Sequence, residues 1–272
     1  MIKMKMILKF LVQKFGINVP LSLRKGPGVR LTPAYLFLLF LLTFNSCKKE
    51  SNVFKSSGPV TSETRSLNSF DKLTVLKNIT AYIIQDTANF VKITCGKNLL
   101  DGISTNVEGG HLIITNLNKT NWVRSFKNKF IVEVHCRQLV DVRYESSGNL
   151  TVAEPLSADS FFIQSGDGTG SMFLNLNARV LYAVLNTSVA DLTVKGKIQI
   201  NYLFNNAQGF IDTRQVENSY TYMRSNSTND CKVRVKDFLD AEIEYHGNIY
   251  YYGDPTTVNL KKTGTGNLIK AD

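Results

Sequence analysis

From residue 61 onward, short apolar or alternating runs follow one another, and no apolar stripe of helical period reaches useful length. β-Branched and aromatic residues dominate the runs, while Gly, Asn and Asp bound them, as is typical of β-strands. We expect the first strands at residues 73–76, 81–84, 90–94, 111–115 and 130–134. Residues 107–112 predict a hairpin, because Gly109-Gly110 can supply the positive φ of a tight turn. The pattern predicts an all-β protein.

A polar turn rich in Gly, Asn and Ser returns about every twenty residues in the second half of the chain. The first apolar residues after successive turns are Leu150, Met172, Leu192, Phe210, Cys231, Ile249 and Leu268, which lie 22, 20, 18, 21, 18 and 19 residues apart. This period is too short for a propeller blade, and the Leu-x-x-Leu-x-Leu pattern of leucine-rich repeats is absent. We therefore predict a parallel β-solenoid with a coil period of about 20 residues, formed by residues 61–272 as one domain.

The composition of the turns suits the corners of such a coil. Gly tolerates positive φ, and Asn or Ser side chains can bond to the nearby backbone. Stacked Asn side chains can also bond from one coil to the next. The turns therefore need no catalytic explanation.

Residues 1–46 have the layout of an export signal. They carry seven Lys or Arg, no Asp or Glu, and an apolar run at residues 34–42 that is short for a transmembrane helix. Ser46-Cys47 follows this run and resembles the bacterial lipobox, which implies a lipid on Cys47 and anchoring in the membrane. The alternatives are an uncleaved anchor and a plain secretory signal. Residues 47–60 are polar, with Ser, Gly and Pro, and predict a flexible tether after the lipidated Cys47.

The leader is longer than a lipoprotein signal usually is. Starting at Val29 would leave an 18-residue leader, so we interpret residues 1–28 as an over-extended gene start. Reading the codon of Val29 tests this hypothesis, because any valine codon other than GTG ends it.

The formal charge of +10 comes mostly from the leader. Without residues 1–46, 32 − 7 = 25 basic side chains face 22 acidic ones, a net charge of +3. This balance is ordinary for a soluble surface and argues against nucleic acid as a partner.

Cysteine and histidine spacing predicts neither a disulfide framework nor a metal site. With Cys47 lipidated, Cys95, Cys136 and Cys231 remain, and we expect them to act as small buried hydrophobes. The three histidines show no ligand spacing, and no cofactor motif is present in the sequence.

Two groups of residues are candidates for binding. Acids at or near the turns could stack at coil separation around a weakly held calcium ion, although Asp also suits solvated corners; they are Asp159, Asp167, Asp191, Asp212 and Asp230. Tyr220 and Tyr222 share one side of a strand, as do Tyr250 and Tyr252. These four tyrosines are a candidate binding face for sugar rings or a protein, and the alternative is a ladder of stacked aromatics that covers the core.

Trp122 lies in a basic segment, residues 118–129, that also contains Phe126. Such a segment could contact anionic lipid headgroups or lipopolysaccharide, but we favour the alternative of an ordinary solvated loop.

Several segments together resemble a known family: Arg65–Val75, Asn98–Ile114, the repeated Gly-x-Gly-type corners, Ile249–Pro255 and Gly264–Leu268. In order and spacing they are similar to the "head GIN domain, putative auto-transporter adhesin" family, common as lipoproteins in Bacteroidetes-type bacteria. The match covers roughly residues 64–272. The resemblance implies a right-handed, pectin-lyase-like parallel β-helix.

We expect a cell-envelope lipoprotein that binds or adheres through the faces of the solenoid and is not an enzyme. Its anchor would lie in the outer membrane, with the domain facing the periplasm or the cell surface, and its ligand would be a glycan or a protein. The alternatives are a β-helix enzyme acting on polysaccharide and a periplasmic structural scaffold. A groove with three or four clustered carboxylates would favour the enzyme.

Overall fold

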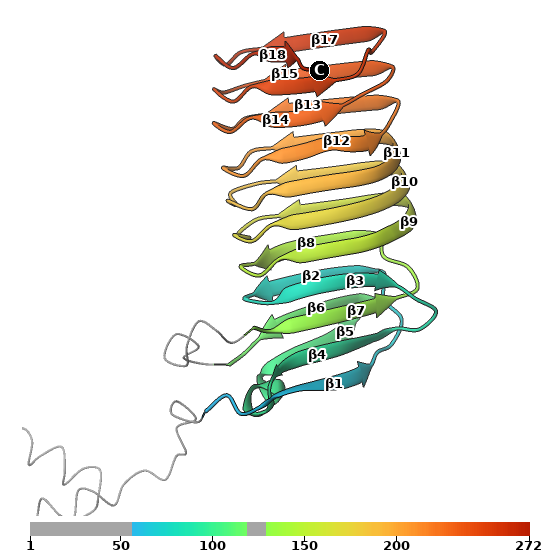
Figure 1. The fold of residues 1–272 in the computed structure, drawn as a ribbon, viewed down its shortest axis with the longest axis vertical. Coiled ribbons are helices and arrows are strands. Elements are labelled where there is room, and N and C mark those ends of the chain that lie inside the picture. Colours follow the sequence, from blue (N-terminus) through green and yellow to red (C-terminus); the bar gives the residue numbers. More distant parts are fainter. Residues whose placement is uncertain (1–55, 119–128) are drawn as a thin grey trace, which may run out of the picture. The chain divides into compact units, whose positions relative to one another are not determined.

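The computed structural model describes residues 56–118 and 129–272, and most of these residues belong to strands that wind into a β-solenoid (Figure 1). The strands are β1 (Val60–Ser66), β2 (Lys72–Lys77), β3 (Thr80–Gln85), β4 (Phe90–Gly96), β5 (Ile103–Glu108), β6 (His111–Asn116), β7 (Ile131–Cys136), β8 (Asp141–Ser146), β9 (Leu150–Ser165), β10 (Met172–Leu185), β11 (Leu192–Asn205), β12 (Ile211–Glu217), β13 (Tyr220–Ser225), β14 (Cys231–Arg234), β15 (Phe238–Ile243), β16 (Ile249–Tyr252), β17 (Thr257–Lys262) and β18 (Leu268–Lys270). One 3-10 helix, Lys97–Gly102, joins β4 to β5. The five strands expected early in the chain are therefore confirmed.

Each turn of the solenoid contributes one strand to each of two sheets. Sheet 1 runs in the order β1, β4, β7, β3, the first halves of β9, β10 and β11, then β12, β14, β16 and β18. Sheet 2 runs β5, β6, β2, β8, the second halves of β9, β10 and β11, then β13, β15 and β17. From β8 onward all neighbours in both sheets are parallel, which confirms the predicted parallel solenoid with its period of about twenty residues.

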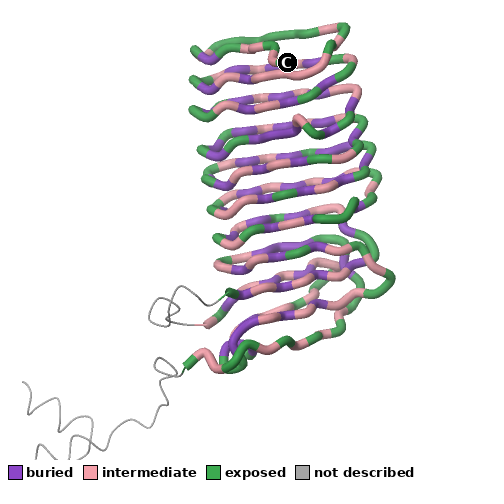
Figure 2. Tube along the Cα trace, viewed as in Figure 1, coloured by how far each residue is buried: buried purple, intermediate pink, exposed green. Residues whose placement is uncertain are grey.

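The core lies between the two sheets, because alternate side chains of most strands are buried (Figure 2). In β13, for example, Thr221, Met223 and Ser225 are buried while the residues between them are partly exposed. Neighbouring rungs bring the same inward positions into register, so each buried residue packs on its counterparts above and below. No single rung could bury its own apolar face, and stacking supplies the missing cover.

The predicted first residue of one sheet 1 strand was wrong by one position. Phe210 is 37% exposed, and Ile211 is the fully buried residue that opens β12 and pairs with Leu192. The corrected steps from Leu150 onward are 22, 20, 19, 20, 18 and 19, which are more regular than the sequence suggested. Phe210 is the first apolar residue after the turn, but the ladder register decides which apolar residue turns inward.

The turns from sheet 2 to sheet 1 are held by close stacking between rungs. A Cβ added at Gly170 would overlap the carbonyl oxygen of Gly148, and one at Gly209 would overlap that of Ala190. These glycines are not among the residues with positive φ, so close approach of backbones, and not the predicted left-handed conformation, explains the glycine there. The expectation of positive φ is correct at Gly109 (57°) and Gly110 (77°), which form the predicted hairpin between β5 and β6.

The predicted bonding of Asn side chains between rungs is confirmed. At four positions, the side chain of the residue just before a sheet 1 strand accepts a hydrogen bond from the equivalent backbone N–H of the next rung. The pairs are Asn149 with Ser171 (3.2 Å), Asp191 with Phe210 (3.2 Å), Asp230 with Asn248 (2.8 Å) and Asn248 with Asn267 (2.9 Å). Backbone donors that the turns leave without ladder partners are thereby satisfied.

The first rungs do not follow chain order. β2 lies between β6 and β8, and β3 lies between β7 and β9, so the rung made by β2 and β3 is inserted between two rungs that come later in the sequence (Figure 1). The antiparallel strands β1, β4 and β5 complete this end of the solenoid. No helix in the described residues is long and apolar enough to cross a membrane.

Candidate functional site

The outer face of sheet 2 carries a surface that we call the aromatic strip. It consists of Phe162, Tyr182, Tyr202, Phe204, Tyr220, Tyr222 and Phe238, from β9, β10, β11, β13 and β15. Phe162, Tyr182, Tyr202 and Tyr222 are direct partners in the ladder and form one column across four rungs. All seven side chains point away from the core, because the residue that follows each of them is buried.

The rings of the strip pack against one another. Tyr182 and Tyr202 are stacked, with centroids 4.7 Å apart and planes 12° apart, and Phe204 and Tyr222 lie 5.6 Å apart at a tilt of 53°. Stacking covers the ring faces in the middle of the strip and leaves ring edges toward solvent. The most open members are Tyr182, which is 39% exposed, and Phe238, which is 50% exposed.

Carboxylates from the next rung fix two of the tyrosines. The Tyr220 hydroxyl donates to Asp240 Oδ2 at 2.7 Å, and the Tyr222 hydroxyl donates to Glu242 Oε2 at 2.8 Å. Burial and the neighbouring carboxylates raise the pKa of both phenols, so both remain neutral donors near neutral pH. The expected ladder of stacked aromatics is thus present, and it lies on the outer surface of the solenoid.

The four tyrosines named from the sequence do not form one surface. Tyr220 and Tyr222 belong to sheet 2, whereas Tyr250 and Tyr252 belong to β16 in sheet 1, on the opposite side of the coil. The guanidinium of Arg214 lies over the Tyr252 ring, 5.7 Å from its centroid. Alternation along a strand correctly predicts that each pair shares a side, but it cannot tell which sheet the strand enters. Five further members of the strip were not predicted, although their spacing of about one period was an available signal; they are Phe162, Tyr182, Tyr202, Phe204 and Phe238.

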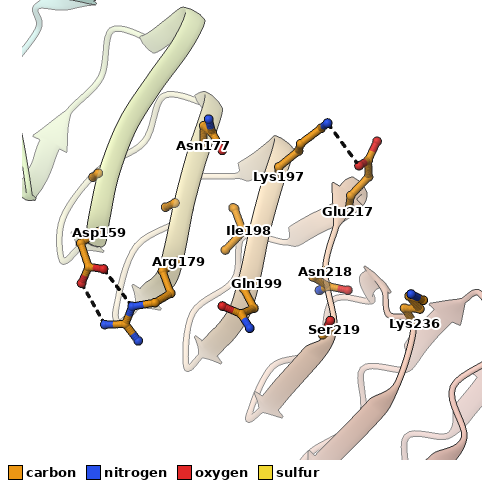
Figure 3. Close-up of a pocket in the computed structure, with 12 residues that line it drawn as sticks. Asp159, Asn177, Arg179, Lys197, Ile198, Gln199, Glu217, Asn218, Ser219 and Lys236 are labelled. Carbon is orange, nitrogen blue, oxygen red and sulfur yellow. Dashed lines mark hydrogen bonds and ion pairs between the residues drawn. The ribbon is translucent and has the colours of Figure 1, made fainter.

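A second feature borders the aromatic strip, where the chain bends from sheet 1 into sheet 2. An open groove of about 570 Å³ runs along these bends over successive rungs (Figure 3). Its floor is formed by Ala158, Ala178, Ile198 and Asn218. We call this feature the edge groove.

Charged side chains line both walls of the edge groove. Arg179 Nε and Nη2 each lie 2.8 Å from a carboxylate oxygen of Asp159, and this bidentate pair lowers the pKa of Asp159 to about 2. The Lys197 Nζ lies 3.9 Å from Glu217 Oε2 (Figure 3). Lys236 makes no ion pair with any residue that the structure describes.

The turn acids do not gather into a cation site in the described part of the chain. Asp191 and Asp230 accept backbone hydrogen bonds in the corner ladder, and Asp212 pairs with Arg214 at 2.7 Å. Asp159 lies in the edge groove, across the coil from the corner that holds Asp167. Within residues 56–118 and 129–272, no three His, Cys, Asp or Glu side chains are placed to share a metal ion. The positions of these acids therefore give no support to the calcium site that the sequence left open as an alternative.

The three cysteines behave as expected. Cys95, Cys136 and Cys231 are unbonded and buried, and burial raises the pKa of all three thiols, to about 11 for Cys95 and about 12 for Cys136. Cys47 and Trp122, which the sequence analysis singled out for lipidation and headgroup contact, lie outside the described residues.

Stacked parallel rungs with a solvent-facing aromatic sheet define a β-solenoid whose outer faces are available for binding. The family model described as "Putative auto-transporter adhesin, head GIN domain" matches residues 69–255, and the chain belongs to this family. The resemblance identified from the sequence is thereby confirmed.

Solved structures show the same fold. A "putative adhesin" from Bacteroides fragilis NCTC 9343 is 21% identical with a TM-score of 0.72, and the alignment covers 78% of this chain and 97% of that one. A "putative adhesin" from Parabacteroides distasonis ATCC 8503 is 16% identical, with a TM-score of 0.62 over 79% and 98% of the two chains. A "putative lipid binding protein" from the same strain is 19% identical, with a TM-score of 0.59 over 80% and 98%. No curated protein matches the sequence.

Proposed function

We propose that this protein is a cell-envelope lipoprotein that works as a non-catalytic adhesion module, and that the aromatic strip is its contact surface. Membership of an adhesin-type family supports the class of function. The single observation that carries the surface is the position of the strip, on a sheet face that no described segment covers. Contiguous apolar surface left open to solvent is a feature of interaction sites.

The layout of the strip suits binding by contact and complementarity. Seven rings on five strands are held by the rigid ladder, so little conformational entropy is lost when a ligand docks. Asp240 and Glu242, which fix the hydroxyls of Tyr220 and Tyr222, add hydrogen-bonding groups beside the rings. Tyrosine and phenylalanine offer large contact areas, and interfaces are enriched in them.

The carboxylates near this surface support a binding role over a hydrolytic one. The edge groove contains two, Asp159 and Glu217, and each lies beside a cationic side chain. A general acid in glycoside hydrolysis needs a raised pKa, whereas the pKa of Asp159 is lowered by Arg179.

The anchor completes the proposal. The lipobox-like Ser46-Cys47 supports attachment through a lipid on Cys47, and the polar residues 48–60 support a tether between the lipid and the domain. The lipid would place the domain at the outer membrane, either in the periplasm or on the cell surface. In cells fed an alkyne fatty acid, we expect the native protein to be labelled and Cys47→Ser to be unlabelled. Labelling of the Cys47→Ser variant would refute the anchor.

The test of the contact surface compares the two sheets. We expect Tyr182→Ser combined with Phe238→Ser to weaken binding to host-cell or bacterial surfaces about tenfold, because both open rings of the strip are removed. Phe173→Ser is a matched control, since Phe173 is 43% exposed but lies on sheet 1. Tyr250→Ser with Tyr252→Ser is a second sheet 1 control, and it tests the other pair named from the sequence.

The outcome separates the two sheets directly. Equal binding by the folded Tyr182/Phe238 variant and the native protein would remove the strip as the contact surface. Loss of binding only in the Tyr250/Tyr252 variant would move the surface to sheet 1. Proteolysis of intact cells distinguishes surface display, in which the domain is cleaved, from retention in the periplasm, in which it is protected.

A further inference from the structure

The edge groove has the features of a ligand site that the aromatic strip lacks. Its floor follows the solenoid axis, because Ala158, Ala178 and Ile198 are partners in successive rungs. Rungs are about 4.8 Å apart, so the groove is an elongated trough whose floor residue changes from Ala to Ile to Asn along its length. A linear ligand fits this shape better than a compact one.

The polar residue of the floor, Asn218, is held from within the coil. Asn218 is only 8% exposed, and its Nδ2 donates to Thr221 Oγ1 at 2.7 Å. Its Oδ1 is buried and has no partner among the described residues. The amide oxygen is therefore enclosed below the floor, and a ligand in the groove contacts the walls and the apolar part of the floor.

The walls of the groove carry an excess of positive charge. Three cations, Arg179, Lys197 and Lys236, face two carboxylates, Asp159 and Glu217. Arg179 is fully engaged by the bidentate pair with Asp159. The Lys197–Glu217 pair is long, and both side chains are about three-quarters exposed (74% and 77%), so it is easily exchanged for a ligand. Lys236 is exposed and makes no ion pair with a described residue.

We infer that the edge groove is a binding site for an acidic oligosaccharide, with a sugar carboxylate paired with Lys236. The inference rests on the proposed binding function and names the class of ligand. The apolar floor accepts the C–H face of a pyranose ring, while the polar walls accept its hydroxyls. A neutral sugar would leave Lys236 without a counter-ion.

The groove is continuous with the aromatic strip. Its wall residues Gln199 and Ser219 are followed directly by Ile200 and by Tyr220 of the strip. A branched or long glycan seated in the groove can therefore extend onto the rings of sheet 2. The two features form adjoining parts of one surface.

The test uses the full chain, purified in detergent, on an array of uronic-acid and sialic-acid oligosaccharides printed beside their methyl esters. Esterification removes the negative charge and keeps the sugar. We expect at least one free acid to bind and its ester to bind about tenfold more weakly. Lys236→Glu should lower binding of the acid by a similar factor, and Lys236→Arg should retain it.

Lys195→Glu is the matched control, because Lys195 is also exposed but lies outside the groove on β11. Equal binding of acids and esters, or no effect of Lys236→Glu, would overturn the inference. A third outcome would also overturn it: the protein binds no glycan on the array, but it binds cells, and protease treatment of the cells abolishes that binding. This outcome would indicate a protein ligand. The proposed contact surface fails separately, if the Tyr182/Phe238 variant binds cells normally.

Discussion

At the scale of single residues, the corners show how one residue type serves two purposes. Glycine returns at the turns, and the sequence suggests positive φ as the reason. The structure assigns that role to the hairpin at Gly109-Gly110, whereas Gly170 and Gly209 are required because the previous rung passes too close for a Cβ. The position of glycine was predictable, but its physical cause depends on stacking that no local pattern reveals.

Replacing Gly209 by Ala tests this close approach. The added Cβ would overlap the Ala190 carbonyl oxygen, and we expect the free energy of unfolding to fall by about 1–3 kcal/mol in a denaturant titration. Gly166→Ala is the control, because the nearest atom to its added Cβ is the flexible Glu145 carboxylate at 3.4 Å. Equal stability of the two variants would show that the rungs can move apart without cost.

The corner ladder makes a second prediction. Asp230 Oδ1 accepts from both the backbone and the side-chain nitrogen of Asn248, at 2.8 and 3.0 Å. Asp230→Ala should lower the free energy of unfolding by about 1 kcal/mol, because two donors lose their acceptor. Asp230→Asn keeps an acceptor oxygen and should cost less. If Asn is as harmful as Ala, the hydrogen bond does not stabilise the corner.

The buried thiols predict how stability depends on alkaline pH. The pKa values of Cys95 and Cys136 are raised to about 11 and about 12 when the protein is folded, whereas an unfolded thiol has a pKa of about 8.5. Because the folded values are higher, their stabilising contribution is complete below about pH 8.5 and is lost as the pH rises toward 12. Unfolding titrations between pH 7.5 and 10.5 should show this decline. The Cys95→Ala/Cys136→Ala variant should show a shallower one, and equal slopes would contradict the assignment.

At the scale of elements, strands were predictable and their partners were not. Alternation of apolar residues places Tyr220 beside Tyr222 and Tyr250 beside Tyr252 correctly, because the side chains on one strand depend only on the local period of two. Assignment to sheet 1 or sheet 2 depends on where the chain bends within each coil. Only two members of the aromatic strip, Tyr220 and Tyr222, were therefore predicted from the sequence. The edge groove was not predicted, because it is formed by the bends between the sheets.

The first strand offers a test at this scale. Arg65, in β1, donates from Nη1 to the Ile103 carbonyl at 2.5 Å and from Nη2 to the Leu100 carbonyl at 3.2 Å, so its guanidinium joins β1 to the chain that leads into β5. Lysine cannot donate in this forked geometry. We expect Arg65→Lys to lower stability by about 1–2 kcal/mol and to speed hydrogen exchange in β1 and β4.

Hydrogen exchange in distant strands is the control for the Arg65 variant. The same measurement on β13 and β15 should be unchanged, because these strands lie many rungs away. Faster exchange throughout the solenoid would mean that the protein unfolds as one unit and that β1 is not a separately secured end.

At the scale of the whole molecule, each rung contacts chiefly its neighbours, so stability is approximately a sum over adjacent pairs. The period of about twenty residues made this architecture predictable from the second half of the chain. The first half was not predictable in the same way, because the strands between β1 and β7 carry no repeat and pair out of sequence order.

Removal of rungs from the two ends should have different effects. Deleting residues 245–272 removes β16, β17 and β18, and we expect the remaining rungs to fold with a smaller m-value and a lower Tm. Ile83→Asp places a charge at a buried position of the inserted rung and should prevent folding of the rungs on both sides of it. Circular dichroism with denaturant titration distinguishes the two results. Complete unfolding of the truncated chain would contradict the additive description.

The inserted rung also determines the order in which the solenoid can assemble. A chain that emerges with its N-terminus first delivers β2 and β3 before either of the rungs that flank them exists. β6 and β7 then cover one side of this rung. Its other side stays open until β8 and β9 have followed, and β9 ends at Ser165. Every later rung, in contrast, can add to a template that is already complete. The inserted rung therefore waits longest between its own synthesis and its enclosure, and a chaperone that binds incomplete chains has its longest opportunity there.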